Sequence, residues 1–570
     1  MKKFVSIFLA LTMIFSLAIT ALAEESTKLT VTPDQSGVER TYVGHQLLKL
    51  ESMSLKEGEH HPEDCPNKKD ETAEHDENCY HYAYTVVSKY KEILQKEVLA
   101  YAGTSFWGNT TQPSSHTLVT DDHILAYLAS LTSDDDNGGF GTLRKVADRI
   151  YREIKNAGIG SDTEEFTTST NIEKGYWILE DVTNLGGKEA ASSLVIVDTL
   201  AKDNIEITPK TSLPTLTKKV QDIEDSENLT IADMLWYDSA DHDIGDNVPF
   251  KLTATLPSNI QYYTSYTITF HDTLSPALQL TDTNRLTENL TDGSDKSFRV
   301  LMYRDLGTAN ADTDLNAGKD VTGSFTINKA ATDCTTNCSF EVTGNIYNIP
   351  GIEEELTANT TFVVYYEAEL LESAVLGNPG NPNSAYLEFS NNPYDINKTG
   401  RTKDDKVVVF TYQFILNKVD QHNHPLKGAE FTLYKMILGE ENWKEVAHLK
   451  VEDDGTKFIW TGLDDGDYKM VESTVPEGFN GMADRQFTIV ATHDLDSDDP
   501  KLTYLGTANS PDNGDVVTGA MEETVANRSG AALPETGGMG TMMLIGGGAM
   551  FVTVAAVFMV TRKKMSIYED

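Results

Sequence analysis

The sequence predicts a mainly β protein in which a mixed α+β region precedes tandem antiparallel β-sandwich domains. Two segments, residues 211–405 and 406–530, consist of short β-branched and aromatic runs separated by turns rich in Asn, Asp, Gly and Pro. That alternation is typical of sandwich domains. Residues 24–210 mix runs with strand periodicity and runs with helix periodicity. The 570 residues suffice for about three or four domains of ~150 residues each.

Composition excludes some classes of function. Asp and Glu number 88 against 46 Lys and Arg, so the formal charge is −42. A surface that recognises phosphates needs a surplus of Lys and Arg, and we therefore expect no nucleic-acid partner. Hydrophobic residues make up 39% of the chain, which is enough for packed cores rather than wholesale disorder.

The first region is expected to combine strands with three helices. A polar, His-rich insertion, residues 60–81, interrupts it. The expected strands are 29–32, 41–50, 175–181 and 193–199, and the expected helices are 83–102, 121–131 and 143–157.

The two following regions are expected to contain strands throughout. In residues 211–405 the expected strands are 248–255, 264–270, 296–303, 339–342, 361–370 and 384–389. In residues 406–530 they are 406–419, 429–436, 457–461, 466–472 and 485–491.

The beginning of the chain predicts export. A charged start is followed by an apolar run over residues 4–19 and by small residues that end at Ala23. This order is typical of a secretory signal peptide. We therefore expect residues 1–23 to be removed, and residues 24–210 to be the first domain of the exported chain.

The last forty residues, 531–570, predict a second processing signal. The motif Leu533-Pro534-Glu535-Thr536-Gly537 precedes an apolar run, residues 538–560, and a basic tail. The run is long enough to cross a bilayer, and the cations would hold its end in the cytoplasm. Together these features resemble the cell-wall sorting signal of Gram-positive surface proteins. The resemblance implies that a sortase cleaves between Thr536 and Gly537 and transfers Thr536 to an amine, so that the mature chain keeps no membrane span.

One strand of residues 406–530 carries a Lys on its apolar face. Phe414, Leu416 and Lys418 share that face by the period-two rule. A Lys among core positions is costly unless it is paired or chemically changed. Glu472 also points inward from the segment 466–472, and Asn527 lies near the end of the domain.

These segments resemble the B-type repeat domain of Gram-positive collagen adhesins, which is also common in pilins. The matching stretches are 418–420, 425–434, 466–468, 472, 476–479 and 527. The resemblance implies tandem Ig-like or prealbumin-like sandwiches. It also implies that Lys418 and Asn527 condense into an isopeptide bond, helped by the buried acid Glu472.

The proposed chemistry is consistent with burial. Burial disfavours a charged amine, so a neutral Lys can act as the nucleophile. A protonated acid can polarise the Asn carbonyl and move protons. Attack at the amide carbon would release ammonia and tie two strands together covalently.

The middle domain repeats this arrangement. In the segment 214–220, Lys218 shares a face with Leu216 and Val220, which makes Lys218 the inward Lys and Lys219 the outward one. The stretches 270–276 and 389–393 resemble two marker segments of the second domain of pilin backbone subunits. The resemblance implies a bond from Lys218 to Asn391 with Asp272 as the acid; the alternatives left open are Lys219, Asn392 and Glu367.

Between the first two domains lies the stretch 204–211, which contains Lys210. It resembles the short segment of shaft pilins whose Lys attacks the sortase-bound Thr of the next subunit, although Thr208 and Thr211 stand where the family often has Tyr and Asn. The resemblance implies a bond from Thr536 to Lys210. A head-to-tail contact of this kind does not close and produces a filament.

The four Cys residues are expected to form two disulfides, Cys65 with Cys79 and Cys334 with Cys338. The His-rich insertion does not have a recognised zinc spacing, so we expect no metal site there. The sequence also has no nucleophile elbow, phosphate loop or paired-His motif. We therefore expect no cofactor and no enzymatic activity on a substrate.

The predicted function is that of a major pilin, a structural shaft subunit of a fimbrium anchored to the Gram-positive cell wall. The predicted partners are class C-type and housekeeping sortases, neighbouring subunits in a covalent homopolymer, and peptidoglycan. The precursor is expected to be bound to the membrane only transiently, before sorting. The alternative function is that of a singly anchored adhesin or tip pilin that binds host matrix protein or glycan.

Overall fold

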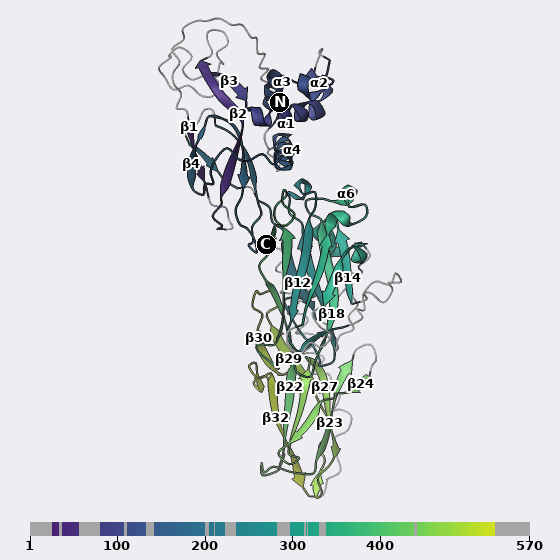
Figure 1. The fold of residues 1–570 in the computed structure, drawn as a ribbon. Helices are drawn as coiled ribbons and strands as arrows, with labels where there is room; N and C mark the ends of the chain where they lie inside the picture. The colour runs from purple at the N-terminus through teal and green to yellow at the C-terminus, as the bar shows by residue number, and fades with distance from the viewer. Residues whose placement is uncertain are drawn as a thin grey trace, which may run out of the picture.

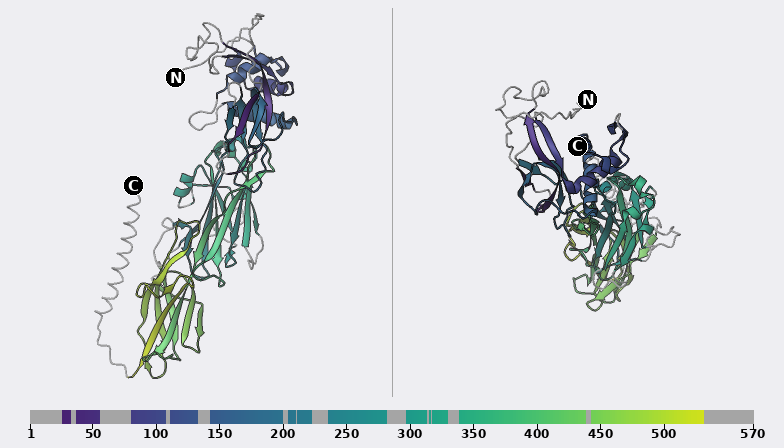
Figure 2. Two further views of the ribbon diagram at one scale, coloured as in Figure 1. Left: turned by 90° about the vertical axis from the view of Figure 1, so that its left-hand side faces the viewer. Right: turned by 45° about the horizontal axis from the view of Figure 1, so that its top comes forward.

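The computed structural model describes residues 26–32, 37–55, 80–107, 111–132, 142–199, 204–209, 211–222, 235–281, 297–312, 315, 317–329, 338–437 and 442–530. Three parts follow one another along a single axis, with the first part at one end and the last part at the other (Figures 1 and 2). Strands predominate in the middle and last parts, and the first part combines strands with the longer helices (Figure 1). The mainly β fold class with an α+β first region is therefore confirmed. None of the described helices is long and apolar enough to cross a membrane.

The first part contains two sheets. The smaller has the order β4(Ser169–Glu173)-β1(Ser26–Val31)-β7(Asn204–Ile207), and the larger has the order β3(Tyr80–Val86)-β2(Tyr42–Leu55)-β5(Gly175–Asp181)-β6(Leu194–Asp198). A core of apolar side chains joins the larger sheet to the helices. The helices are α1(Ser88–Tyr101), α2(Thr104–Trp107), α3(Asp121–Ala129), α4(Thr142–Asn156) and the short 3-10 helix η3(His116–Leu118).

One helix expectation in this part is wrong at its start. The expected helix 83–102 begins only at Ser88, because residues 83–86 belong to β3 and pair with β2. Tyr82, Tyr84 and Val86 alternate with more exposed residues along this strand. Period-two burial of aromatic and β-branched residues favours a strand over a helix.

The middle part is a sandwich of two seven-stranded sheets around one large apolar core. The first sheet has the order β10(Ser239–Asp241)-β21(Asp405–Phe410)-β19(Asn381–Ser390)-β12(Thr267–Leu274)-β17(Cys338–Asn345)-β16(Thr326–Lys329), with β20(Thr399–Arg401) on β19. The second has the order β15(Lys319–Asp320)-β14(Phe298–Tyr303)-β18(Thr361–Leu370)-β11(Asn247–Thr255)-β8(Thr215–Gln221)-β9(Trp236–Tyr237), with β13(Leu278–Leu280) on β18. The remaining helices of this part are α5(Leu306–Ala311), α6(Ile352–Glu355), η5(Ile260–Tyr262), η7(Thr322–Ser324) and η8(Ile346–Asn348).

The last part is a second, smaller sandwich. One sheet has the order β25(Leu449–Glu452)-β26(Lys457–Leu463)-β22(Tyr412–Asp420)-β32(Ala520–Ser529)-β28(Phe479–Asn480), with β31(Gly514–Asp515) on β32. The other has the order β24(Asn442–Glu445)-β23(Glu430–Ile437)-β27(Gly466–Thr474)-β29(Arg485–His493)-β30(Leu502–Thr507). Pairing between the described strands of this sandwich is antiparallel except that β22 and β32 run parallel, and in the middle sandwich β10 and β21 also run parallel. Both pairs depart from the purely antiparallel expectation.

The expected single strand 406–419 is two strands. Its first half is β21, which pairs with β19 in the middle part, and its second half is β22, which pairs with β26 and β32 in the last part. Thr411 separates the two strands. Close packing fixes this junction: Gly462 has φ +76°, and a Cβ there would lie 2.5 Å from Ile244. Both the backbone conformation and the contact therefore require glycine.

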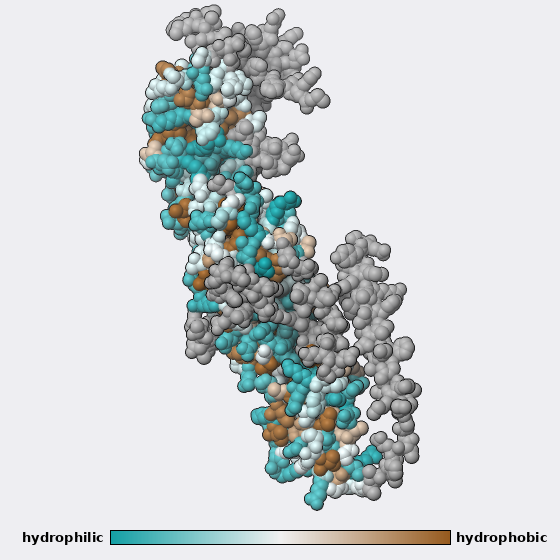
Figure 3. Space-filling model, turned by 90° about the vertical axis from the view of Figure 1, so that its right-hand side faces the viewer, coloured by the Kyte–Doolittle hydropathy of each residue, from teal (hydrophilic) through white to brown (hydrophobic). Residues whose placement is uncertain are grey.

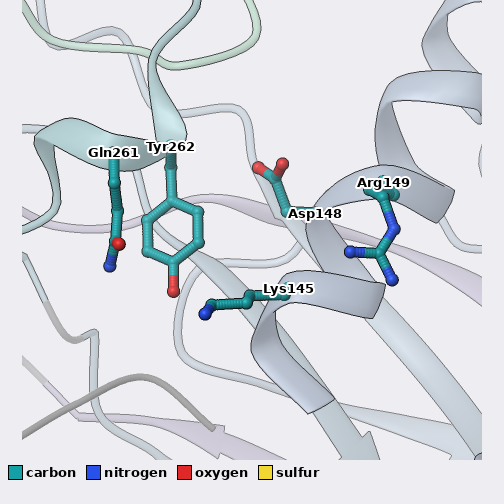
Figure 4. A pocket seen from close by; sticks show the side chains of 5 residues that line it. All are labelled: Lys145, Asp148, Arg149, Gln261 and Tyr262. Carbon is teal, nitrogen blue, oxygen red and sulfur yellow. The ribbon is translucent and has the colours of Figure 1, made fainter. Parts of the chain in front are cut away.

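The junction between the first and middle parts is held by α4. The Arg152 guanidinium donates to the carbonyl oxygens of Pro393 and Tyr262. The Tyr151 and Tyr394 rings meet edge to face, 4.6 Å between centroids. A pocket beside these contacts is lined by Lys145, Asp148 and Arg149 of α4 and by Gln261 and Tyr262 of η5 (Figure 4).

One face of the molecule is predominantly polar. Figure 3 shows one face on which hydrophilic and intermediate residues predominate, with hydrophobic residues in small separate groups. Such scattered apolar residues are normal on a soluble surface.

Candidate cross-linking sites

In the last part, strand pairing brings the first and last strands side by side. Strands β22 and β32 pair in parallel, with Lys418 opposite Val525 and Asp420 opposite Asn527. Lys418 and Asn527 are thus diagonal neighbours, and they are 1% and 2% exposed. Two polar side chains inside a sandwich core require a partner or a reaction.

Glu472 of β27 supplies the third group from the facing sheet. Its Oε1 accepts a hydrogen bond from Asn527 Nδ2 at 2.6 Å and lies 3.9 Å from Lys418 Nζ. Its Oε2 accepts the backbone N–H of Met482 at 2.8 Å, which fixes the carboxyl group. The structure therefore brings Lys418, Glu472 and Asn527 together, as the sequence analysis expected.

The atoms of this group are arranged as reactants. Among the described residues, neither Lys418 Nζ nor Asn527 Oδ1 has a hydrogen-bond partner, although both are buried. Burial lowers the pKa of the Lys418 amine, against the opposing effect of Glu472. The amine thus has a neutral, nucleophilic form beside the amide, and Glu472 contacts the nitrogen that would leave.

The unreacted amine gives a pH test in the variant Asn527→Ala, which removes the amide carbon. The pKa of Lys418 is lower in the folded chain than its ordinary value of 10.5. At pH values between these two pKa values, the unfolded state therefore binds more protons than the folded state. We expect the free energy of unfolding of this variant to rise with pH through that window. Urea unfolding at several pH values measures it, and a profile parallel to that of the unsubstituted chain would contradict the assignment.

In the middle part, Lys218 of β8 contacts the acid that the sequence analysis assigned to it. Lys218 Nζ donates to Asp272 Oδ2 of β12 and, at 2.7 Å, to the hydroxyl of Tyr366 on β18. The Tyr366 hydroxyl in turn donates to Asp272 Oδ2 at 2.8 Å. Lys218 and Asp272 are 0% and 1% exposed.

Burial sets the protonation of this pair. Desolvation lowers the pKa of the Lys218 amine and raises the pKa of the Asp272 carboxyl, and in both cases it outweighs their mutual attraction. Both shifts favour the neutral forms, a free amine beside a carboxylic acid. This is the combination that amide attack requires.

The structure does not bring Asn391 to Lys218. Asn391 lies after the end of β19, where its Nδ2 donates to the carbonyl oxygens of Leu185 and Ala190 in the first part, both at 3.3 Å. Its backbone carbonyl also accepts the N–H of Ser192. Asn391 therefore ties the first part to the middle part instead of facing the buried Lys.

Asn383 occupies the position that the sequence analysis gave to Asn391. It is 0% exposed on β19, and its Nδ2 donates to the Tyr366 hydroxyl at 2.8 Å, the same oxygen that Lys218 contacts. Its Oδ1 has no hydrogen-bond partner in the part of the chain that the structure describes. The available signal was strand periodicity, because Asn383 alternates in register with the buried residues Ala385, Leu387 and Phe389.

The other candidates that were left open lie elsewhere. Lys219 points away from the core and donates to Asp238 at 2.5 Å. Asn392 forms a turn in which its Oδ1 accepts the backbone N–H of Tyr394. Glu367 is the strand neighbour of Tyr366 and so lies on the opposite face of β18.

Several predicted positions lie outside the described residues. They include Lys210, the motif from Leu533 to Gly537, the segments 1–23 and 538–560, and Cys65, Cys79 and Cys334. Cys338 begins β17, but its side chain is not among those described. The disulfide, sorting and subunit-linking assignments therefore stay predictions.

Comparison with known proteins finds a domain match in the last part. Residues 412–501 match the model of the SpaA prealbumin-like fold domain. Over 284 residues, 48% of this chain, the sequence is 27% identical to the trypsin-resistant surface T6 protein of Streptococcus pyogenes serotype M6. That alignment spans 44% of the relative's length.

Solved structures with a similar arrangement include two backbone pilins. The T6 backbone pilin of serotype M6 Streptococcus pyogenes aligns with a TM-score of 0.46 and 15% identity, covering 89% of this chain and 99% of that one. The major pilin SpaD of Corynebacterium diphtheriae aligns with a TM-score of 0.39 and 13% identity, covering 89% and 98%. The match of residues 412–501 to the prealbumin-like domain model confirms the prealbumin-like expectation for the domain that contains Lys418.

Proposed function

We propose that this chain is the shaft subunit of a covalent cell-surface pilus, stiffened by two intramolecular Lys–Asn isopeptide bonds. The observation that carries the proposal is the pair of buried groups, Lys418–Glu472–Asn527 and Lys218–Asp272–Asn383. Each group joins a strand near the start of its sandwich to one near the end. The similarity to a surface protein of Streptococcus pyogenes supports display on a Gram-positive cell.

The chemistry is the same at both sites. The Lys amine attacks the Asn side-chain carbonyl carbon, the C–N bond to the amide nitrogen breaks, and ammonia leaves with a proton from the amine. The acid accepts and returns protons, so no oxidant or cofactor is consumed. Each bond forms once, which makes the reaction maturation of a structural protein rather than enzymatic turnover.

The positions of the two bonds favour a role under tension. A pull along the chain would pass from Lys218 to Asn383, continue through β21 and β22, and cross from Lys418 to Asn527. The strands between each bonded pair would carry no load. Sortase-catalysed transfer of Thr536 to Lys210 would complete this covalent path, because Lys210 precedes β8 by only a short connection.

The same path leaves the first part outside the line of force. Its strands and helices precede Lys210 in the sequence. In a filament joined through Lys210, this part would be attached laterally and held through contacts such as those of Arg152 and Asn391. Stiffness would then reside in the middle and last parts.

The test is the substitution Lys210→Ala, expressed in a Gram-positive host with its sortases. We expect the ladder of SDS-resistant, high-mass species to disappear while monomer still reaches the cell wall, because only the acceptor amine is lost. The matched control is Lys403→Ala, an exposed Lys whose side chain is 86% accessible. A ladder that persists in Lys210→Ala would overturn the linkage through Lys210, and an unsubstituted chain that forms no ladder at all would favour the singly anchored adhesin.

A further inference from the structure

A group of carboxylates lies where the middle and last parts meet. Asp241 ends β10 of the middle part, and Asp464 and Asp465 form the turn between β26 and β27 of the last part. One oxygen from each of the three lies within 4.8 Å of the others. Asp241 and Asp464 are 3% and 2% exposed, so the repulsion between them is poorly screened by water.

One oxygen of Asp241 has a partner and the other does not. Its Oδ1 lies 3.3 Å from Nε2 of His493, the last residue of β29. His493 Nδ1 faces Ser239 Oγ, whose single proton is donated to the Asp494 carbonyl, so Nδ1 must carry hydrogen. Asp241 Oδ2 is buried without a hydrogen bond of normal geometry among the described residues, although the Tyr412 hydroxyl, itself unpartnered, interacts with this carboxylate.

The Lys435 ammonium at this joint is committed to two other carboxylates. Lys435 of β23 donates to Asp243 Oδ2 at 2.8 Å and to Asp464 Oδ2 at 3.2 Å. Asp243 also accepts the backbone N–H of Asp464 through its Oδ1 at 2.9 Å. Lys435 thus links the two parts, and one positive charge serves two carboxylates without reaching the unpartnered oxygen of Asp241.

We propose that Asp241, Asp464 and Asp465 bind a divalent cation that joins the middle part to the last part. An all-oxygen ligand set selects hard cations, namely Ca²⁺, Mg²⁺ or Mn²⁺. The neighbouring set of Asp222, Asp241 and His493 is less suited, because His493 Nε2 already faces Asp241 Oδ1. A cation on Asp241 Oδ2 satisfies the orphaned oxygen and neutralises the carboxylates that approach from both sides.

The cation would act on the joint between the sandwiches. Asp241 is held in a sheet of the middle part by the pairing of β10 with β21, which leads into β22. Asp464 is positioned by its backbone bond to Asp243 across the same joint. Binding would therefore resist bending between the two sandwiches.

The test uses the mature chain, residues 24–536, stripped with EDTA and dialysed. Isothermal titration with Ca²⁺, Mg²⁺ and Mn²⁺ separately, and metal analysis of the reloaded protein, should find one tightly bound ion per chain. Asp465→Asn, at a less buried ligand, should lower the affinity at least tenfold and remove the thermal stabilisation by the ion. Asp498→Asn, an exposed Asp on the loop after β29, makes the same charge change and should leave binding unchanged.

Two outcomes would overturn the proposal. Absence of stoichiometric binding for all three ions would mean that the carboxylates are held by protons and Lys435 alone. Binding that survives Asp465→Asn and Asp241→Asn undiminished would place the ion elsewhere on the chain. Because Asp465→Asn removes one charge without changing shape, this test does not depend on whether Asp241→Asn folds.

Discussion

Asn383→Ala is expected to leave the chain without its middle-part bond, whereas Asn391→Ala is expected to leave that bond intact. Asn383 shares the Tyr366 hydroxyl with Lys218, while Asn391 is bonded to the first part. Each bond releases one ammonia of ~17 Da. After correction for the substitution, the intact mass of Asn383→Ala should therefore be ~17 Da higher than that of the unsubstituted chain. Asn391→Ala should match the unsubstituted chain.

The loss of this bond should also be large in stability. A cross-link that closes a loop of this length is worth about 5 kcal/mol in the chain-entropy model. For a sandwich of this size that corresponds to roughly 10–20 °C in the unfolding midpoint of the middle part. Differential scanning calorimetry measures it, with Asn391→Ala as the matched Asn control.

The result also has a clear opposite. If Asn391→Ala retains the ~17 Da of the unreleased ammonia and Asn383→Ala does not, the bond runs to Asn391. The contact of Asn383 with Tyr366 would then have no part in the reaction. If both variants match the unsubstituted mass and none of the three has lost the ammonia, Lys218 is an ordinary buried partner of Asp272. If all three have lost it, the bond runs to another residue, and peptide mapping of the linked fragment identifies that partner directly.

The contrast between Asn383 and Asn391 shows what the sequence could and could not predict. Period-two alternation correctly placed Lys218 and Lys418 on inward faces, because that property belongs to a single strand. The partner of Lys218 depends on which strands face each other across the sandwich. Tyr366 was missed for the same reason, since nothing local marks it as the bridge between β8, β12 and β19.

The errors in secondary structure have a similar origin. The expected strand 406–419 is continuous in pattern, and only tertiary pairing reveals that Thr411 divides it between two sandwiches. The carboxylates at that junction are likewise scattered in the sequence. Asp241, Asp464 and Asp465 meet only because the first strand of the last part continues from the middle part's sheet.

Glu472→Ala is expected to abolish the bond in the last part while leaving both reactants in place. Lys418 and Asn527 become the two ends of the bond, whereas Glu472 is regenerated by the reaction. Its removal therefore tests the proton transfer without removing either reactant. Glu472 contacts Asn527 Nδ2 at 2.6 Å and faces Lys418 Nζ at 3.9 Å. Without it, no other described acid is seen in contact with Lys418 Nζ or Asn527 Nδ2 to accept the amine proton or to deliver one to the departing nitrogen.

Two readouts distinguish this prediction from a general packing defect. The intact mass of the variant, corrected for the substitution, should be ~17 Da higher than that of the unsubstituted chain, because one ammonia is not released. The unfolding midpoint of the last part should fall by roughly 10–20 °C. Glu477→Ala, an exposed Glu in the turn after β27, is the matched control and should change neither. A variant that still loses the ammonia would show that burial alone activates Lys418, and Glu472 would then only position Asn527.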